Sequence, residues 1–242
     1  PEMCISDTRD PARLRGELDA ATSALERQLA KEEAARRAEA VQQAGGVLAM
    51  EDLAEHRGDS WVEPISLDYA GVRVWECPPN GQGLAALMAL NALRTFELPA
   101  TAEPVAAADR YHVAIECMRQ AFADAAAHIA DPEHANVPVE QLLEADYGQQ
   151  RAAQIDPRRA HPEVAAGVLR EGGAGSDTVY FCTVDAAGNG CSVVNSNYMG
   201  FGTGIVPQGC GFTLQNRGAG FSHESGHPNQ LAPRKRPYHT II

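Results

Sequence analysis

The stretch 178-TVYFCTVDAAGNGCSVVNSN-197 contains two runs of β-forming residues separated by a turn. Residues 178–185 predict one strand, and residues 190–197 predict the returning strand. Gly188 and Asn189 lie between the two runs and tolerate the positive φ angles that a tight turn requires. The stretch therefore predicts an antiparallel β-hairpin.

The expected register of this hairpin brings polar groups to its first residue. If Asp185 faces Gly190 across the turn, Thr178 lies opposite Asn197 and beside Ser196, and a shift of one residue exchanges these two partners. The hairpin also leaves open a disulfide between Cys182 and Cys191. In either register a hydroxyl and an amide approach Thr178.

The segment before Thr178, 172-GGAGSD-177, carries almost no side-chain bulk. Such a segment leaves the bond between Asp177 and Thr178 accessible to cleavage, although an ordinary loop followed by an ordinary strand residue is the alternative. Cleavage would free the α-amino group of Thr178. A threonine hydroxyl becomes a useful nucleophile when a base takes its proton, and the α-amino group, with a pKa of about 8, is such a base.

The remaining chain alternates between helical and extended patterns. The extended patterns predict a hairpin over 62–75, turning at Ala70-Gly71, and a strand over 206–215. The apolar periodicity predicts helices over 11–43, after the turn at 78–83, over 109–129 and over 138–153. A helical first part followed by an antiparallel β second part predicts the α+β class.

The composition excludes several function classes. The net charge of −12 argues against nucleic-acid and anionic-membrane partners, and we expect no membrane span. The six cysteines form no C-x-x-C pair. We expect no metal site, because His223 and His227 flank Gly226 and precede Pro228, and no cofactor.

The two ends, Pro1 and Ile242, predict a piece of a longer polypeptide. For its location we favour the cytoplasm, with a periplasmic or secreted location as the alternative.

Ordered motifs through most of residues 45–242 resemble the gamma-glutamyltranspeptidase family of N-terminal-nucleophile hydrolases. The motifs that carry the resemblance are 45-GGVL-48, 61-WVEPI-65, 78-PPNGQG-83, 121-AFAD-124, 177-DT-178, 201-FGTGIV-206 and 235-KRP-237. The resemblance implies a partial αββα sandwich, with residues 1–177 belonging to a large subunit and residues 178–242 to a small subunit of one precursor.

The resemblance also implies an activity and its residues. Self-cleavage between Asp177 and Thr178 would release Thr178 to attack a γ-glutamyl amide such as glutathione, and the acyl group would pass to water or an amine. Ser196 matches the hydroxyl that supports the nucleophile. Substrate-binding positions fall on Asn197, Tyr198, Arg217, His239 and Thr240.

Two departures from the family pattern affect the expected substrate. Gly220 stands where the family has an aspartate that binds the substrate α-amino group, and Arg217 stands where it has a glutamine. Arg217 suits a carboxylate, which favours a dicarboxylic acyl group without an α-amine, as in relatives that resemble cephalosporin acylases. The alternative is that Arg217 is a solvated loop charge.

The resemblance also places a substrate arginine and the oxyanion glycines of the family outside residues 1–242. A catalytically silent fragment or homologue is therefore the alternative function, since losing an oxyanion donor typically costs about a hundredfold or more in rate.

Overall fold

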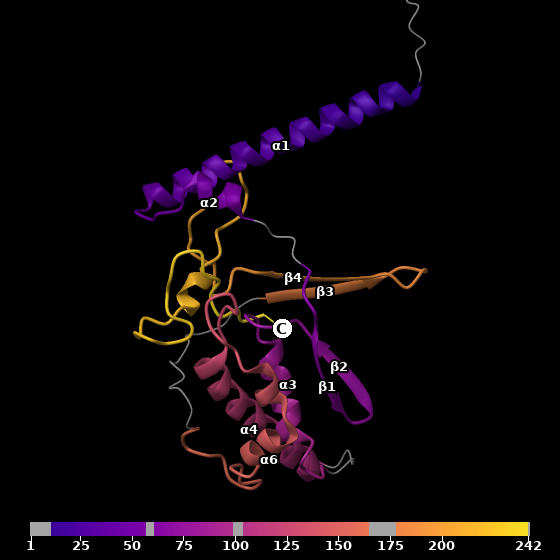
Figure 1. Ribbon diagram of the computed structural model, residues 1–242, viewed down its shortest axis with the longest axis vertical. Coiled ribbons are helices and arrows are strands. Elements are labelled where there is room, and N and C mark those ends of the chain that lie inside the picture. Colours follow the sequence, from indigo (N-terminus) through magenta and orange to yellow (C-terminus); the bar gives the residue numbers. More distant parts are fainter. Residues whose placement is uncertain (1–10, 57–60, 99–103, 165–177, 242) are drawn as a thin grey trace, which may run out of the picture. The chain divides into compact units, whose positions relative to one another are not determined.

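The computed structural model describes residues 11–56, 61–98, 104–164 and 178–241. In chain order the elements are α1 (Pro11–Gln43), α2 (Met50–Glu55), β1 (Ile65–Tyr69), β2 (Val72–Glu76), α3 (Gly83–Leu93), α4 (Pro104–His128), α5 (Val139–Leu143), α6 (Ala145–Ala152), β3 (Thr178–Val184), β4 (Gly190–Ser196) and the 3-10 turn η1 (Arg217–Gly220) (Figure 1). The strands form two antiparallel hairpins, β1–β2 and β3–β4. The α+β class expected from the sequence is confirmed.

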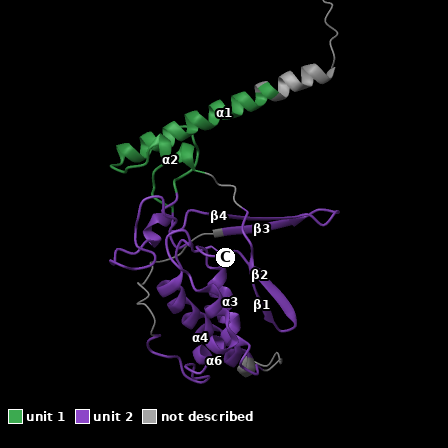
Figure 2. Cartoon of the chain, viewed as in Figure 1, with its two compact units in different colours: residues 1–59, 201–214 green, residues 60–200, 215–242 purple. Residues whose placement is uncertain are grey.

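The chain divides into two compact units, residues 1–59 with 201–214 and residues 60–200 with 215–242 (Figure 2). The first unit is built on the C-terminal half of α1. There Ala38 is buried, and the guanidinium of Arg37 lies 5.0 Å from the ring centre of Phe212. The Asp52 carboxylate caps α2 by accepting the Ala49 N–H at 2.8 Å.

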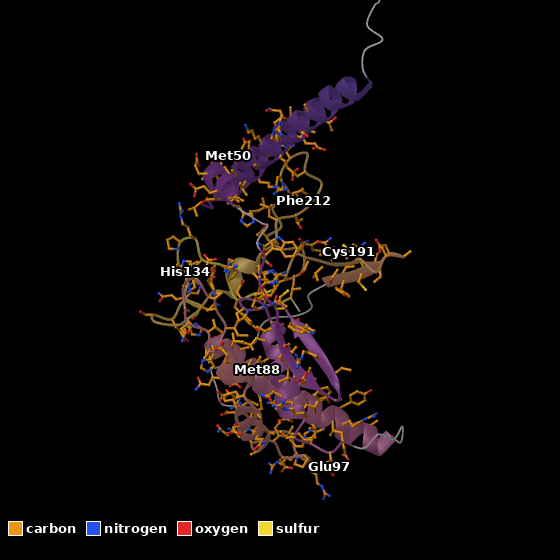
Figure 3. The ribbon with its side chains drawn as sticks, turned by 45° about the vertical axis from the view of Figure 1, so that its right-hand side comes forward. Met50, Met88, Glu97, His134, Cys191 and Phe212 are labelled. Atoms are coloured by element: carbon orange, nitrogen blue, oxygen red, sulfur yellow. The ribbon has the colours of Figure 1, made fainter. Side chains whose placement is uncertain are left out.

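The second unit has its core between α3 and α4. Small and branched apolar side chains make up most of this core. Met88, which is labelled in Figure 3, contributes to the core from α3. Its buried members are Leu84, Ala85, Met88, Ala89, Ala121, Ala125, Ile129 and Leu142. The β1–β2 hairpin adds buried Leu67 and partly buried Ile65, so a sheet face and the helices share one apolar layer.

The turn of the β1–β2 hairpin is set by its local sequence. Ala70 and Gly71 have φ angles of 50° and 83°, and Tyr69 pairs with Val72 around them. Two successive positive φ angles give the turn whose twist matches that of the strands. The hairpin expected over 62–75 is confirmed, with strands over 65–69 and 72–76.

The helix expected over 138–153 is interrupted, so this prediction was wrong in one respect. Glu144 has a non-helical backbone, with φ −59° and ψ 144°, and separates α5 from α6. The side-chain amide of Asn91, fully buried on α3, donates to the Glu144 carbonyl at 2.8 Å and to the Leu142 carbonyl at 3.5 Å. Because these bonds come from another helix, they satisfy carbonyls that a continuous helix would have used itself.

The register of β3–β4 differs by one residue from the first expectation. Val184 pairs with Gly190, and Thr178 pairs with Ser196 rather than with Asn197. The reason lies in the turn, where the Asp185 carboxylate accepts the N–H groups of Ala187 at 2.9 Å and Asn189 at 2.8 Å. Asp185 is therefore a turn residue, as is typical of Asp side chains that bind nearby backbone N–H groups.

The same register keeps the two hairpin cysteines unpaired with each other. Cys182 lies opposite Ser192, Cys191 lies opposite Thr183, and both are free thiols. Cys191 is labelled on β4 in Figure 3. The disulfide left open by the sequence is absent here.

The strand expected over 206–215 is replaced by turns, so that prediction was wrong. Positive φ angles at Gly204, Gly209 and Gly211 break the extended backbone, and Pro207 has no N–H to donate to a ladder. Isolated bonds close this loop instead, from Thr203 N to the Leu214 carbonyl at 2.8 Å and from Leu214 N to the Ile205 carbonyl at 3.0 Å. Among the helices that the structure describes, none has the length and apolarity to cross a membrane.

Candidate active site

The end of the β3–β4 hairpin brings the two expected catalytic residues into register. Thr178 is the first residue of β3 and is the cross-strand partner of Ser196, the last residue of β4. Directly opposed residues in an antiparallel pair have Cα atoms roughly 4.5–5.5 Å apart. Asp177, the other residue of the expected cleavage bond, lies outside the described residues.

The hydroxyl of Ser196 accepts two hydrogen bonds. One comes from the Tyr198 N–H at 3.0 Å, and the other comes from Nη2 of Arg217 at 3.1 Å. Tyr198 follows β4 with a positive φ of 76°, which turns the chain and allows its N–H to reach back to Ser196. Two donors, one of them charged, fix the position of this hydroxyl beside the start of β3.

Asn216 holds the segment before η1 against the end of β4. Its N–H donates to the Asn197 carbonyl at 3.2 Å, and its side-chain oxygen accepts the Met199 N–H at 3.0 Å. The side-chain amide of Asn216 also donates to the Met199 carbonyl at 3.3 Å. These bonds explain why Arg217, the next residue, reaches Ser196.

Arg217 is buried, with 5% of its surface exposed. Its Nη1 donates to Oγ1 of Thr240, and its guanidinium lies 5.1 Å from the ring centre of Tyr198. Burial lowers the pKa of Arg217, yet arginine stays protonated at neutral pH because its ordinary pKa is so high. The alternative of a solvated loop charge was therefore wrong, and Arg217 places a fixed positive charge beside two hydroxyls.

Residues 236–241, which we call the C-terminal strap, supply His239 and Thr240. The strap has no regular secondary structure, and Asn80 binds it twice. Its side-chain amide donates to the Pro237 carbonyl at 2.7 Å, and its carbonyl accepts the His239 N–H at 2.8 Å. Burial, and then the charge of Arg217, lower the pKa of His239, which favours a neutral imidazole at neutral pH.

A cavity of about 1060 Å³ lies over these residues. Its lining includes Ser196, Arg217 and His239 together with Tyr180 and Asn80, and it also contains Pro64, Trp75, Glu76, Cys77, Pro78, Gly81, Gly83, Ser192, Val194, Asn195, Gln215, Arg236, Pro237 and Ile241. Among these lining residues Glu76 is the acidic one, whereas Arg217 and Arg236 are both cationic. The volume suits a small molecule, and the balance of charge favours an anionic one.

Gly220 lies where its backbone leaves little room for a side chain. A Cβ atom there would come within 3.0 Å of the Tyr238 carbonyl oxygen. The Gly220 carbonyl accepts the side-chain amide of Asn229 at 2.7 Å, and Oδ1 of Asn229 accepts the Tyr238 N–H at 3.0 Å. Asn229 thus ties η1 to the strap and keeps the two backbones close.

The structure joins Ser196, Tyr198, Arg217 and Thr240 of the expected site residues by direct contacts, and His239 lines the same cavity. Asn197 takes part through its carbonyl. Sequence patterns assigned no role to Asn80 or Asn229. For Asn80 the available signal was its place in the motif 78-PPNGQG-83.

His223 and His227 lie in irregular backbone rather than on a helix. Across the described ranges, no three His, Cys, Asp or Glu side chains gather in a way that would hold a metal ion.

Residues 31–242 match the family model described as gamma-glutamyltranspeptidase. The chain is 36% identical over 206 residues to the glutathione hydrolase-like YwrD proenzyme of Bacillus subtilis, and 35% identical over 209 residues to the oxamate amidohydrolase proenzyme of Klebsiella pneumoniae. These matches cover 84% and 86% of this chain and 37% of each relative. The chain therefore spans little more than a third of the length of these relatives.

A solved structure gives the corresponding result for the fold. The cephalosporin acylase from Bacillus halodurans matches with a TM-score of 0.73 and 44% sequence identity, over 87% of this chain and 36% of that chain.

Proposed function

Since the chain belongs to the gamma-glutamyltranspeptidase family, we propose that the complete protein is a proenzyme that cuts itself before Thr178 and then hydrolyses or transfers the acyl group of a small amide. In this proposal residues 1–177 belong to the large subunit and residues 178–242 to the small subunit. The observation that carries it is the pairing of Thr178 with Ser196, whose hydroxyl is held by buried Arg217.

The proposed cleavage begins at the Thr178 hydroxyl. Its oxygen attacks the carbonyl carbon of Asp177, the bond to the Thr178 nitrogen breaks, and the hydroxyl proton passes to that nitrogen, which becomes a free α-amino group. Water then hydrolyses the resulting ester, which leaves a new carboxylate on Asp177 and restores the hydroxyl. Fixed donors around Ser196 support this step because they orient the group beside the nucleophile before reaction.

In turnover the free α-amino group acts as the base. It takes the proton of the Thr178 hydroxyl, whose oxygen attacks the amide carbon of the substrate. The amide C–N bond breaks, the leaving amine receives the proton, and the acyl group remains as an ester on Thr178. Water or an acceptor amine then takes the acyl group.

We further propose that the acyl group ends in a carboxylate and lacks an α-amino group. Arg217 has five N–H donors, and within the described ranges Ser196 and Thr240 accept one bond each from it. The other donors are the ones we assign to an anion. Gly220 supplies no carboxylate for an α-ammonium group. One relative is named for hydrolysing oxamate, which carries a carboxylate and no α-amino group, and this supports the assignment.

Two measurements on the complete protein test this function. After incubation, mass spectrometry should find two chains that meet between Asp177 and Thr178, and Thr178→Ala should remain one chain without turnover. A glutaryl anilide should be hydrolysed faster than γ-glutamyl-p-nitroanilide.

An uncut and inactive wild-type protein would support the catalytically silent alternative. Equal or better γ-glutamyl turnover would overturn the substrate class while leaving the cleavage intact.

A further inference from the structure

The C-terminal strap is held by hydrogen bonds from other segments rather than by another strand. Asp131 binds Arg236 N, Asn80 binds the Pro237 carbonyl and His239 N, and Asn229 binds Tyr238 N. The Gln82 N–H also donates to the Ile241 carbonyl at 3.3 Å. Buried backbone groups need such partners, so the path of the strap depends on these four residues.

Asp131 binds both the backbone and the side chain of its strap partner Arg236, which lies 105 positions farther along the chain. It follows α4, in the loop that contains His134 (Figure 3), and is 1% exposed. One carboxylate oxygen accepts the Arg236 N–H at 2.9 Å, and the other accepts Nη2 of Arg236 at 2.6 Å. Burial alone would raise the pKa of Asp131, but its bonds to Arg236 and to the Glu133 N–H hold that pKa at about 2.

Thr240 lies four residues beyond Arg236 and accepts the hydrogen bond from Arg217. The intervening residues are bound by Asn80 and Asn229, so Arg236 begins a series of anchored residues that leads to Thr240. Release of Arg236 would loosen this series and move Thr240 away from the guanidinium. Arg217 would then lose one of the two hydroxyls that fix its orientation. A carboxylate recognised by two parallel N–H bonds is sensitive to such a rotation.

We propose that Asp131 is a positioning residue for the substrate site, which clamps the C-terminal strap through Arg236 and so holds Thr240 against Arg217. The specificity consequence rests on the proposed function. Asp131 precedes the proposed cleavage bond and Arg236 follows it, so this clamp is also a non-covalent link between the two products of cleavage.

Glu133 provides a matched control. Its carboxylate also accepts Nη2 of Arg236, at 3.1 Å, but its side chain is 75% exposed. The exposed contact to Glu133 contributes little to stability. Asp131 is buried, so replacing one of its acceptor oxygens by an amide NH2 would leave a donor of Arg236 without its partner. Asp131→Asn and Glu133→Gln therefore each remove one carboxylate charge that contacts Arg236. The carboxylate that is removed is buried in the first variant and exposed in the second.

The first experiment measures hydrogen exchange in the complete protein, in peptides that cover residues 236–241. Asp131→Asn should accelerate exchange of the strap amides at least about tenfold, whereas Glu133→Gln should stay within about twofold of wild type. Equal exchange in both variants would overturn the clamp. Hydrogen exchange does not require catalytic turnover. It therefore tests whether Asp131 holds the strap even if the Thr178→Ala experiment contradicts the proposed function.

The second experiment separates positioning from general destabilisation. With a glutaryl anilide Asp131→Asn should raise KM about tenfold with kcat within about threefold, and with a valeryl anilide, which lacks the carboxylate, KM should be unchanged. An equal rise for both anilides, or no rise for either, would contradict the specificity role. Circular dichroism at the assay temperature establishes that each variant is folded.

Discussion

The Arg217 guanidinium joins Ser196 to Thr240, with one hydrogen bond to each hydroxyl. Ser196 ends a strand and is the cross-strand partner of Thr178, whereas Thr240 lies on the irregular C-terminal strap. One buried cation thus connects the proposed nucleophile position to the proposed substrate-binding strap. A change at Arg217 should therefore disturb both the Ser196 and the Thr240 hydroxyl, and through them substrate binding.

Replacing Arg217 by lysine keeps the charge but removes the planar fork. A single ammonium group cannot reproduce the geometry that reaches Ser196 and Thr240 while leaving donors for a carboxylate. We expect KM for a glutaryl anilide to rise at least about tenfold, in line with the loss of a charge-assisted hydrogen bond of about 1.5–3 kcal/mol. Steady-state kinetics of the processed protein measures this change.

The control for Arg217→Lys is the uncharged valeryl anilide, whose KM should change little. If lysine left the glutaryl KM at the wild-type value, the proposal that Arg217 binds the acyl carboxylate would be untenable.

Replacing Ser196 by alanine leaves two donors, Nη2 of Arg217 and the Tyr198 N–H, without the acceptor that the structure shows. An unsatisfied buried donor costs about 1–3 kcal/mol. If that cost falls on the reacting geometry, we expect cleavage before Thr178 to slow by roughly 5–150-fold. The rate is measured by following the uncut chain on gels over time.

Ser192→Ala is the matched control for Ser196→Ala. Ser192 also lines the cavity, but it is exposed and its hydroxyl donates to the Tyr180 hydroxyl at 3.3 Å. Cleavage of Ser192→Ala should proceed at about the wild-type rate, and a similar delay in both variants would speak against a specific role for Ser196.

Gly220→Asp introduces the residue type that the family has at this position. The backbone around Gly220, however, leaves little space for the new side chain. The new Cβ would lie 3.0 Å from the Tyr238 carbonyl oxygen, and forcing a side chain into a packed site typically costs about 1–3 kcal/mol. We expect Gly220→Asp to lower the urea midpoint of unfolding without raising γ-glutamyl-p-nitroanilide turnover.

Gly218→Asp adds the same side chain in the same 3-10 turn, where a Cβ would meet nothing within 4 Å. Its stability should stay within about 0.5 kcal/mol of wild type. Wild-type stability together with new γ-glutamyl activity in Gly220→Asp would show that this position has the room we exclude.

The ion pair between the buried Asp131 carboxylate and Arg236 predicts a pH-dependent contribution to stability. Because the pKa of Asp131 is about 2 in the folded protein and 3.8 in its ordinary state, the stabilisation is full above about pH 4 and is lost as the pH falls toward 2. The shift corresponds to about 2 kcal/mol. The difference in unfolding free energy between wild type and Asp131→Asn should therefore shrink across this range.

Urea unfolding at pH 6, 4, 3 and 2 measures that difference. Glu133→Gln serves as the control and should follow wild type throughout, since Glu133 is exposed. A gap between wild type and Asp131→Asn that stays constant down to pH 2 would contradict the assignment of the shift to Asp131.

Local sequence determined the secondary structure where short-range physics is enough. The hairpin around Ala70-Gly71 and the helices over 11–43 and 109–129 follow from turn conformations and apolar periodicity, and the structure has them close to the expected bounds. The register of β3–β4 was off by one residue because the Asp185 carboxylate draws its own residue into the turn. The split at Glu144 escaped prediction because its cause is Asn91, a residue on another helix.

By itself, the sequence led, through its family motifs, to the residues that we propose carry the chemistry, among them Thr178, Ser196 and Arg217. Tertiary structure alone decided that Arg217 is buried between Ser196 and Thr240, and that Asp131 binds Arg236 across 105 positions of the chain. The physical reason is that periodicity and turn propensity act over a few residues, whereas burial and long-range hydrogen bonds exist only after distant segments have packed together.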